Sequence, residues 1–490
     1  TDLLLNLSYS NEDKKIAFYL KSVTEFYKGN YEKALDYGNR VNSKEINIID
    51  NDIFLNHILR VSNFGMKFNE VNTEHFKIRY SNPKDIILTR YAEKILESAY
   101  HEVGLDLDIY PEEPVIVEIY PDLENFIIAS TLSEKDIKTT GVVGICKFNR
   151  IIILSPRLLP KGYTWFDTLT HEYTHYLIFI KSENKTPVWL HEGIAKFEEK
   201  RWKDAKRNTM TPFYESLLAR ALKDDKLVPI EKMHPSFGKL SNSYEAQLAF
   251  AQAGTTIDFL VNNWGNGAIK NLLTTLKQKN DYRASIKEVT EVDFEKFYNL
   301  WLEDLIAKNL SERIPELEVN EIRFRNRNNA EDNSEDLIDI KDIQAREYSR
   351  LGDILRTRGR LKAATYEYEK AMHFDPISPV VLNRLASSKN ALGEYEESEQ
   401  VLKPLLEFYP DYFDTHINLG LIYLNKSNLA KAEEALNNAI SINPFDPQVH
   451  IALISLYEKQ ELLKLVEKEN DVLRIILGEA SNDEQIPIPN

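Results

Sequence analysis

The spacing of apolar residues predicts an α/β region in the middle of the chain. Three short segments rich in β-branched residues and bounded by Pro, Asn or Asp have the pattern of strands, at 75–80, 115–120 and 150–156. A helical pattern over roughly 84–102 separates the first two strands. From Trp165 onward apolar residues recur every three or four positions, through 165–181 and again after Pro187. We therefore expect an α+β fold in which a mixed sheet is followed by a pair of helices.

The C-terminal third carries an internal repeat. Pro376, Pro410 and Pro444 follow one another at intervals of 34 residues. The aligned units place small residues, such as Gly352 and Gly420, where two helices of a unit would approach closely. The proline ends each unit because it cannot continue a helix. The period and the design resemble those of tetratricopeptide (TPR) repeats, which stack into an all-α solenoid.

These patterns divide the chain into four parts. Near the start, Gly29, Tyr31 and Ala34 match part of the repeat pattern and predict a helical hairpin. The stretch that precedes the repeats is polar, with its charges in blocks, and this composition predicts a flexible linker. The expected parts are an N-terminal TPR-like helical region at 1–70, the α+β domain at 74–310, the linker at 323–342 and the TPR solenoid at 345–478.

Bulk composition narrows the classes of partner. The chain has 490 residues, 43% of them hydrophobic, and a formal net charge of −16. This length exceeds that of one typical domain, and the acidic balance argues against a nucleic-acid partner. No run approaches the ~18 apolar residues that a membrane span needs, so no integral membrane segment is expected. The partners predicted from composition are proteins, peptides or small molecules.

The single cysteine and the first residues carry two further expectations. Cys146 cannot form a disulfide within the chain or a Cys-based zinc site. The sequence starts without Met and without a basic and apolar leader, as a processed product would. We expect export to a bacterial periplasm or cell envelope with the leader removed, and a cytoplasmic location is the alternative.

The stretch "HEYTHYLIFIKSENKTPVWLHEG" concentrates the chemistry of the chain. On a helix over 165–181, His171 and His175 lie on one face about one turn apart, so their imidazoles can share one ion. Glu172 lies about 100° further round the helix, where it can take a proton from water beside the ion without ligating it. This is the His-Glu-x-x-His arrangement of zinc peptidases.

A catalytic zinc site needs a third protein ligand. After His175 the helix can run ~9 Å to about Lys181, turn, and return ~7.5 Å from Pro187 to Glu192. The two arms match, so Glu192 can arrive level with the histidines. Thr186 as N-cap and Pro187 as first helical residue would start the return helix. We predict one Zn²⁺ per chain, held by His171, His175 and Glu192, with Glu172 as general base.

These residues, together with "WLHEGIAKF", resemble the gluzincin metallopeptidases, and most closely the bacterial peptidase MA-like group. The resemblance covers about 74–310 and implies a zincin-like fold with Glu192 as the third ligand. A C-terminal repeat array also looks typical of that group. The resemblance further suggests that the strand and loop around 141–148 receive an extended peptide by strand addition.

The chain departs from the gluzincin pattern at two positions. Phe250 stands where related sequences carry the Tyr that holds the oxyanion. Tyr244 or His234 could hold the oxyanion in its place. Lys196 stands four residues after Glu192, where thermolysin-like members place a carboxylate that orients a ligand. The role of that carboxylate, which is to orient a ligand histidine, would then fall to Asp167, Glu198 or Glu199. His191 is expected to be a core or rim histidine.

Two functions follow from these observations. The first is a zinc-dependent endopeptidase or aminopeptidase that acts on a peptide or protein substrate, with the repeats recruiting a protein partner. The second is a non-catalytic scaffold with a peptidase-like domain kept for binding. Glu172 favours the peptidase because it is dispensable for holding zinc, whereas Phe250 in place of tyrosine favours the scaffold.

Overall fold

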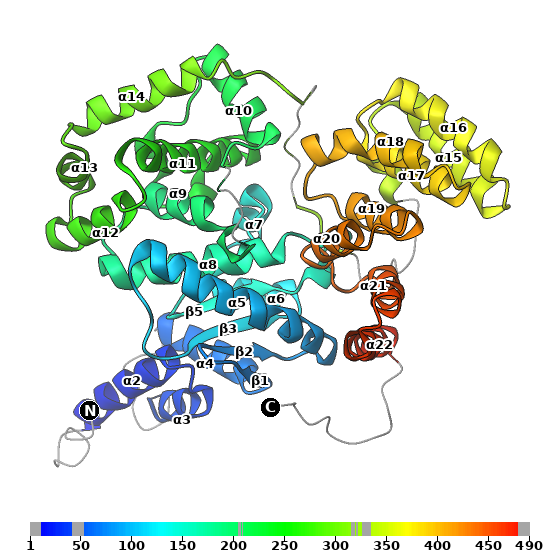
Figure 1. Cartoon of the computed structure of the whole chain (residues 1–490). Helices are drawn as coiled ribbons and strands as arrows, with labels where there is room; N and C mark the ends of the chain where they lie inside the picture. Colours follow the sequence, from blue (N-terminus) through cyan, green and yellow to red (C-terminus); the bar gives the residue numbers. More distant parts are fainter. Residues whose placement is uncertain are drawn as a thin grey trace. The chain divides into compact units, whose positions relative to one another are not determined.

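The computed structural model describes residues 11–41, 53–203, 207, 209–314, 319, 322–325 and 335–478. The chain forms two compact units (Figure 1). One contains Thr1–Ser155 and Phe166–Ile322, and the other contains Pro156–Trp165 and Arg323–Asn490. Several parts of the expected segments lie outside the described residues: 1–10 and 42–52 of the N-terminal region, 204–206 and 208 of the α+β domain, and 326–334 of the linker.

The first unit begins with three helices, α2 (Asn11–Tyr27), α3 (Tyr31–Val41) and α4 (Ile53–Gly65). Gly29 makes the turn between α2 and α3 with φ +70°, a conformation that favours glycine. A Cβ there would lie 2.5 Å from Ile116 Cδ1, so the turn rests directly on the sheet. The N-terminal hairpin is therefore part of the unit that contains the sheet.

The sheet of the first unit has five strands in the order β1-β2-β3-β5-β4. The strands are β1 (Asn69–Asn72), β2 (Phe76–Tyr80), β3 (Val115–Tyr120), β4 (Gly144–Lys147) and β5 (Arg150–Leu154). The three central strands β2, β3 and β5 are parallel, and the edge strands β1 and β4 are antiparallel to their neighbours. All residues of β3 and β5 are buried, which explains why both strands are mainly apolar, with Glu118 and Arg150 as their charged residues. The mixed sheet is confirmed.

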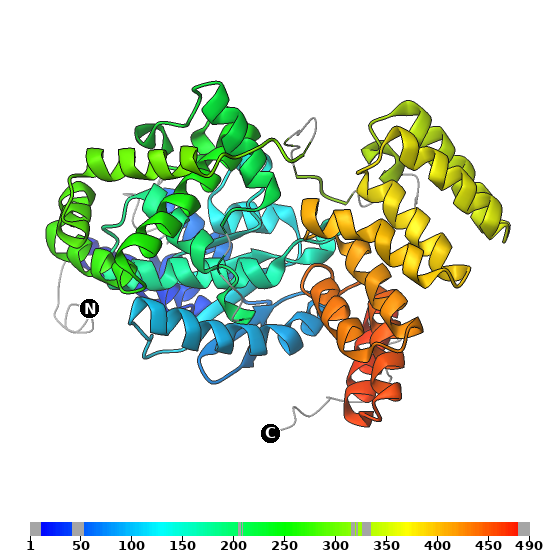
Figure 2. The ribbon, with the colours of Figure 1, turned by 45° about the horizontal axis from the view of Figure 1, so that its top comes forward.

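Helices make up the rest of the first unit. Three lie along the chain between the strands, α5 (Ile86–Leu107), α6 (Leu123–Ser130) and α7 (Glu134–Thr140). Seven follow the sheet: α8 (Trp165–Ser182), α9 (Val188–Glu198), α10 (Pro212–Lys223), α11 (Ser243–Trp264), α12 (Ala268–Lys279), α13 (Tyr282–Thr290) and α14 (Phe294–Ala307). In Figures 1 and 2 the helices after α8 gather on the side of α8 away from the strands.

The contact between α9 and α11 is close because both helices carry small residues there. A Cβ at Gly193 would lie 2.6 Å from the Ala253 carbonyl oxygen.

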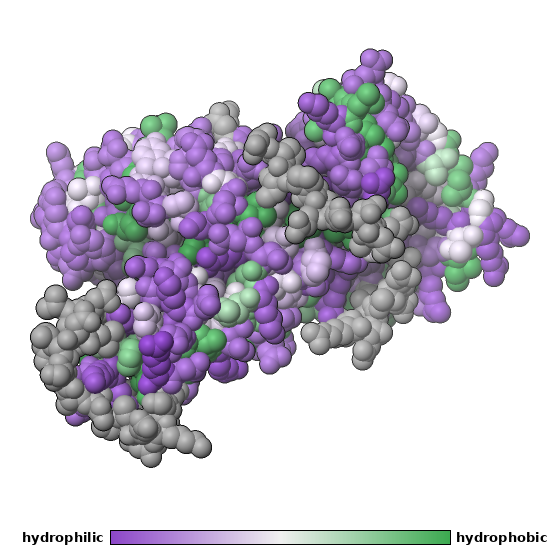
Figure 3. All heavy atoms as spheres, turned by 90° about the horizontal axis from the view of Figure 1, so that it is seen from below, coloured by the Kyte–Doolittle hydropathy of each residue, from purple (hydrophilic) through white to green (hydrophobic). Residues whose placement is uncertain are grey.

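None of the described helices is long and apolar enough to cross a membrane. On the face that Figure 3 shows, the coloured surface is mainly hydrophilic and its hydrophobic residues form small separate patches.

The second unit is built from four consecutive helix pairs. They are α15 (Ile343–Thr357) with α16 (Leu361–Phe374), α17 (Pro379–Ala391) with α18 (Tyr395–Phe408), α19 (Phe413–Asn425) with α20 (Leu429–Ile440), and α21 (Pro447–Lys459) with α22 (Leu463–Leu477). A Cβ at Gly352 would lie 2.4 Å from the Tyr368 ring, and one at Gly420 would lie 2.5 Å from Leu436. The small residues of the repeat therefore do permit the close approach expected of them.

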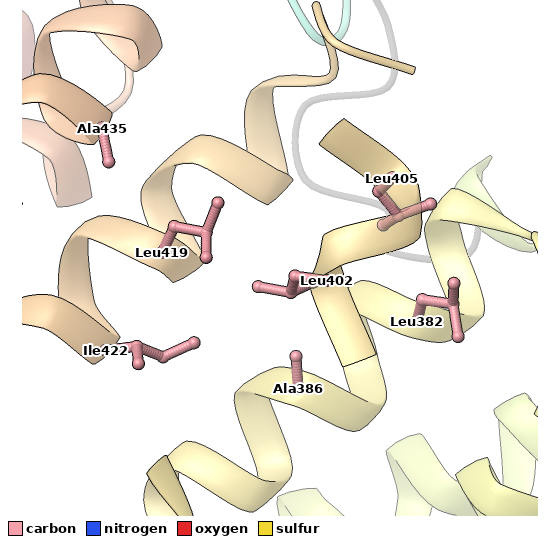
Figure 4. Packing of buried hydrophobic residues seen from close by; sticks show 7 residues of the cluster. All are labelled: Leu382, Ala386, Leu402, Leu405, Leu419, Ile422 and Ala435. Carbon is pink, nitrogen blue, oxygen red and sulfur yellow. The ribbon is translucent and has the colours of Figure 1, made fainter. Parts of the chain in front are cut away.

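Neighbouring pairs bury one another's apolar residues. Leu382, Ala386, Leu402 and Leu405 of the second pair form one cluster with Leu419, Ile422 and Ala435 of the third (Figure 4). Polar contacts repeat with the same period, since the Nε2 atoms of His416 and His450 lie 2.6 and 2.9 Å from the carbonyl oxygens of Pro410 and Pro444. Contacts between neighbouring helix pairs, as well as contacts within each pair, therefore stabilise the solenoid.

Two segments before the repeats pack within the second unit. The short helix η6 (Glu335–Asp339) lies in the expected linker and leads to Ile340, which is fully buried beside Val381. In the segment Pro156–Trp165, the Trp165 indole N–H donates to the Ile440 carbonyl at 2.9 Å, and its backbone N–H donates to that of Ser441 at 3.1 Å. These donors satisfy carbonyls at the end of α20 that have no partner within the helix.

Candidate metal centre

Helices α8 and α9 bring three ligand-type side chains together. His171 and His175 lie one turn apart on α8, with ring centroids separated by 4.7 Å. The Glu192 Oε2 atom on α9 lies 3.5 Å from His171 Nε2 and 3.4 Å from His175 Nε2. All three side chains are partly buried. The segment of α8 after His175 and the segment of α9 before Glu192 therefore place Glu192 beside the two histidines, as expected.

The spacing of these donor atoms fits a zinc ion. Zinc in proteins binds nitrogen and carboxylate oxygen at about 2.0–2.1 Å with tetrahedral geometry, which places neighbouring donors about 3.3 Å apart. The two measured separations are close to this value, and both histidines present Nε2. The donor set of two imidazoles and one carboxylate is also one that catalytic zinc uses.

The second ring nitrogen of each histidine has a partner. His175 Nδ1 lies 2.7 Å from His191 Nδ1, and His171 Nδ1 lies 3.7 Å from Glu199 Oε2. The Lys196 ammonium lies 2.8 Å from Glu199 Oε1. Burial opposes ionisation of Glu199, but the neighbouring Lys196 and His171 outweigh it and hold the pKa of Glu199 below its usual range. Such partners fix the orientation of metal ligands.

Of the three carboxylates considered from the sequence, Glu199 is the one that faces His171. Asp167 accepts a hydrogen bond from the Trp202 indole at 2.7 Å. Glu198 is fully buried with its Oε2 atom 3.4 Å from Arg207 Nε. Lys196, which breaks the family pattern, instead holds Glu199 in place. Glu199 lies one turn further along the chain than the carboxylate of the family pattern.

Glu172 lies in an unusual environment for a carboxylate. Its side chain is 6% exposed, and the backbone N–H of Cys146 donates a hydrogen bond to it. Its Oε2 atom is buried and has no hydrogen-bond partner among the described residues. Burial raises the pKa of Glu172, an effect that the neighbouring His175 and His171 oppose. A buried oxygen without a partner costs free energy unless a ligand or water satisfies it.

Strand β4 forms the edge of the sheet beside Glu172. Its two-residue turn to β5, Phe148–Asn149, has φ of +53° and +61°, as a type I′ turn requires. The Leu154 N–H donates to the Val143 carbonyl at 2.8 Å. Because hydrogen-bonded pairs alternate along an antiparallel ladder, the backbone groups of Gly144 and Cys146 point away from β5. The outward backbone groups of β4 therefore face the site.

A cavity of about 810 Å³ opens over the site. Its lining combines the polar residues His171, Glu172, His175, His191 and Glu192, the backbone of β4, and apolar residues that include Tyr27, Phe148, Tyr176, Phe179, Val188 and Phe250. The cavity lies within the first unit, and its walls come from α2, β4, α8, α9 and α11.

Of the residues expected near the metal centre, Phe250 lines the cavity, whereas Tyr244 and His234 do not. Tyr244 lies in the first turn of α11, where Arg220 and Asp224 are among its electrostatic neighbours, and it does not line the cavity. His234 does not line it either. Phe250 does, and its ring packs on Phe237 with a centroid distance of 4.9 Å. Tyr244 as the residue that holds an oxyanion stays a prediction.

The start of the return helix differs from the expectation. Helix α9 begins at Val188, and Pro187 occupies the N-cap position with extended backbone, φ −67° and ψ 152°. The Thr186 hydroxyl is buried without a hydrogen-bond partner among the described residues, so it caps nothing. The restricted φ of proline still sets the entry to the helix, one residue later than expected.

Sequence reasoning missed two parts of the site. The sequence indicates a core or rim residue at His191, which does line the cavity, but it does not reveal the direct contact of His191 with His175. Its position next to Glu192 was the available signal. Tyr27 lines the cavity although it lies 144 residues before His171, and no local pattern could have indicated this.

Comparison with known families agrees with this organisation. Residues 99–307 match the family described as "Peptidase MA superfamily", and residues 391–457 match one described as "Tetratricopeptide repeat". The chain thus contains a peptidase MA-like domain and TPR repeats, as expected from the resemblance. The first match includes His171, Glu172, His175 and Glu192.

One curated relative is similar over part of the chain. A curated relative, the type IV pilus assembly protein PilF of Pseudomonas aeruginosa, is 27% identical over 125 residues, which is 25% of this chain. The chain spans about half the length of that relative, 50%.

Among solved structures, a TPR protein of Thermus thermophilus, TTC0263, is 26% identical, with a TM-score of 0.25 over 27% of this chain and 73% of that one. Yeast LTA4 hydrolase in complex with bestatin is 11% identical, with a TM-score of 0.31 over 84% of this chain and 66% of that one. Neither similarity assigns a function.

Proposed function

We propose that this protein is a zinc-dependent peptidase of the gluzincin type, with a zincin-like catalytic unit. The observation that carries the proposal is the buried Oε2 atom of Glu172, which lacks a partner among the described residues and lies beside three converging zinc-type donors. A structural metal site has no need of such a carboxylate. A hydrolase needs one to activate water.

The roles of the residues follow from their positions. His171, His175 and Glu192 would hold one Zn²⁺, which when bound polarises a carbonyl group and lowers the pKa of water to about 7. Glu172 accepts a proton from the attacking water and returns it to the leaving amine. Burial raises the pKa of Glu172, so the carboxylate takes up this proton more readily than an exposed carboxylate would.

The edge of β4 supports an extended peptide as the substrate. The outward N–H and carbonyl of Gly144 and the outward carbonyl of Cys146 are available for pairing, while the Cys146 N–H is engaged by Glu172. A peptide that adds as a strand here would pass directly over Glu172. This placement puts a scissile peptide bond between the base and the zinc ligands.

A second candidate function is a scaffold that is catalytically weak or inactive. Phe250 in the cavity wall offers no hydroxyl to an oxyanion, and the TPR similarity to a protein named for pilus assembly supports a role in binding other proteins. In both candidates the repeats recruit a protein partner or substrate. The candidates differ in whether peptide bonds are cleaved.

The test combines metal analysis with a peptide-library digest. We expect about one zinc per purified chain and cleavage of library peptides. Both should be lost in the double variant His171→Ala/His175→Ala and kept in the control His101→Ala, which alters an exposed histidine of α5. Full zinc content in the double variant would refute the metal centre. Zinc binding without cleavage of any peptide would favour the scaffold.

A further inference from the structure

Phe179 continues the line of the metal ligands along α8. It lies four residues after His175, as His175 lies four after His171, so the three share one face of the helix. Phe179 lines the cavity and is 45% exposed. A large aromatic side chain thus stands in the open cavity about one helical turn, or ~6 Å, beyond His175.

Strand β4 runs beside α8, and the turn that follows it carries a second aromatic residue of the cavity. A Cβ at Gly144 would touch Thr168 and Glu172, and Cys146 contacts Glu172 and lies close enough to Tyr176 to affect its pKa. Two residues of strand advance ~6.6 Å and four of helix advance ~6 Å, so the two elements keep step. Phe148 follows directly in the turn after β4, and it lines the same cavity as Phe179.

The N-terminal hairpin supplies a third aromatic residue at this end. Tyr27, the last residue of α2, lines the cavity and is 40% exposed. Its ring centroid lies 6.0 Å from that of Phe148. Phe148 is itself held by Phe26 at 5.4 Å and by His57 at 4.9 Å. The aromatic wall is therefore backed by a packed cluster.

Polar contacts fix the hairpin to the sheet, so Tyr27 has a defined place. The buried guanidinium of Arg150 in β5 donates to the Phe26 carbonyl and to the Tyr31 hydroxyl. Arg79 in β2 donates to the Gly29 carbonyl at 2.9 Å. These hydrogen bonds fix the backbone on both sides of the turn that follows Tyr27. They thereby fix the position of Tyr27 beside Phe148.

A lysine at this end of the cavity disfavours a basic side chain beside it. Lys147 lines the cavity, and its ammonium already donates to the Ser130 carbonyl and the Thr131 hydroxyl. A second cation beside it would be repelled, and the apolar walls would leave it poorly solvated.

We propose that Tyr27, Phe148 and Phe179 form an aromatic subsite that takes a large apolar side chain of the substrate, such as Phe or Leu, next to the scissile bond. This inference rests on the proposed peptidase function, because the subsite is placed relative to the metal centre. It makes the N-terminal hairpin a part of the substrate site. Peptides with a small or basic side chain at that position are therefore expected to be poor substrates.

The experiment uses decapeptides that differ at one scanned position, which carries Phe, Leu, Ala, Asp or Arg. For the full-length protein we expect kcat/KM at the preferred position to be at least ~10-fold higher for Phe or Leu than for Ala, as hydrophobic pockets typically discriminate. Phe179→Ala and Tyr27→Ala should each reduce this preference several-fold, whereas Phe179→Leu should keep most of it. Tyr37→Ala, on α3 of the same hairpin, is the control and should leave the preference unchanged.

A binding arm separates failure of the subsite from failure of the peptidase. The same peptides, labelled with a fluorophore, are titrated into the Glu172→Gln variant and into that variant carrying Phe179→Ala. Selective binding of Phe and Leu peptides that Phe179→Ala abolishes supports the subsite even if no peptide is cleaved. Cleavage or binding without this selectivity, or selectivity that survives both alanine variants, overturns it. Absence of both cleavage and binding also overturns it.

Discussion

Replacement of Gly144 by alanine tests whether the position of Glu172 matters as the structure implies. A Cβ at this position would lie 2.7 Å from Thr168 Cγ2, 2.9 Å from Glu172 Cγ and 3.0 Å from Glu172 Oε1. Ordinary van der Waals contacts begin at 3.4 Å, so the added methyl group must displace α8 side chains by roughly 0.5 Å or more. Glu172 is then pushed away from the β4 edge, where the Cys146 N–H holds it.

The expected consequence is a large loss of activity with little loss of metal. A displacement approaching 1 Å at a reacting group costs up to ~10²-fold in rate, so we expect kcat to fall by ~10–10². Overpacking should also lower the free energy of unfolding by about 1–3 kcal/mol. Zinc content should stay near one per chain, because none of the three ligands contacts Gly144. Peptide hydrolysis, metal analysis and thermal unfolding measure these three effects.

Two further variants assign the effect to Glu172. Gly144→Ala/Thr168→Ser removes the contact with the threonine methyl, so it should recover part of the stability but little of the activity. Gly267→Ala is the control, since its nearest neighbouring atom would lie 3.7 Å away. Wild-type kcat in Gly144→Ala with zinc retained would refute the reasoning that β4 sets the position of the base.

Three other predictions concern stability and metal affinity. Burial lowers the pKa of His57 to about 4, with Lys147 and Arg150 adding to the effect. Because the unfolded histidine binds a proton from about pH 6.5 downward, the free energy of unfolding should fall by about 2 kcal/mol between pH 6.5 and 4. His57→Leu should reduce that loss in urea titrations, and an unchanged pH profile would contradict it. Glu199→Gln should weaken zinc binding ~10–100-fold, measured by chelator competition, because it leaves His171 without its anionic partner; unaltered affinity would rule this out. Trp165→Phe should lower the free energy of unfolding by about 1–3 kcal/mol in denaturant titrations, because a carbonyl at the end of α20 loses its donor; a change below 0.5 kcal/mol would mean that this bond contributes little.

Periodicity and spacing predicted the elements of the site, since these depend on local rules. The four-residue interval of His171 and His175 defines one helical face, and equal arm lengths on either side of a short turn return Glu192 to it. The repeat period likewise predicted the solenoid. In each case the relevant residues lie within one or two elements, so the sequence pattern contains the geometry.

The remaining parts of the site depend on contacts between distant segments. Tyr27 reaches the cavity because Arg150 and Arg79 of the sheet hold the turn after α2, and no local pattern reports such contacts. Strand β1 was not expected because its sequence, Asn-Glu-Val-Asn, is mostly exposed and gains its place by pairing with β2. The choice of Glu199 among three carboxylates required the rotation of α9 about its axis, which spacing alone does not specify.

The central claim, that Glu172 is the base of a zinc peptidase, is tested most directly by Glu172→Gln. The amide keeps the size of the side chain but cannot accept the proton from water. Zinc content and thermal stability should stay near those of wild type, while peptide hydrolysis should fall by at least ~10²-fold. Hydrolysis by Glu172→Gln at the wild-type rate, with zinc bound in both proteins, would contradict the claim.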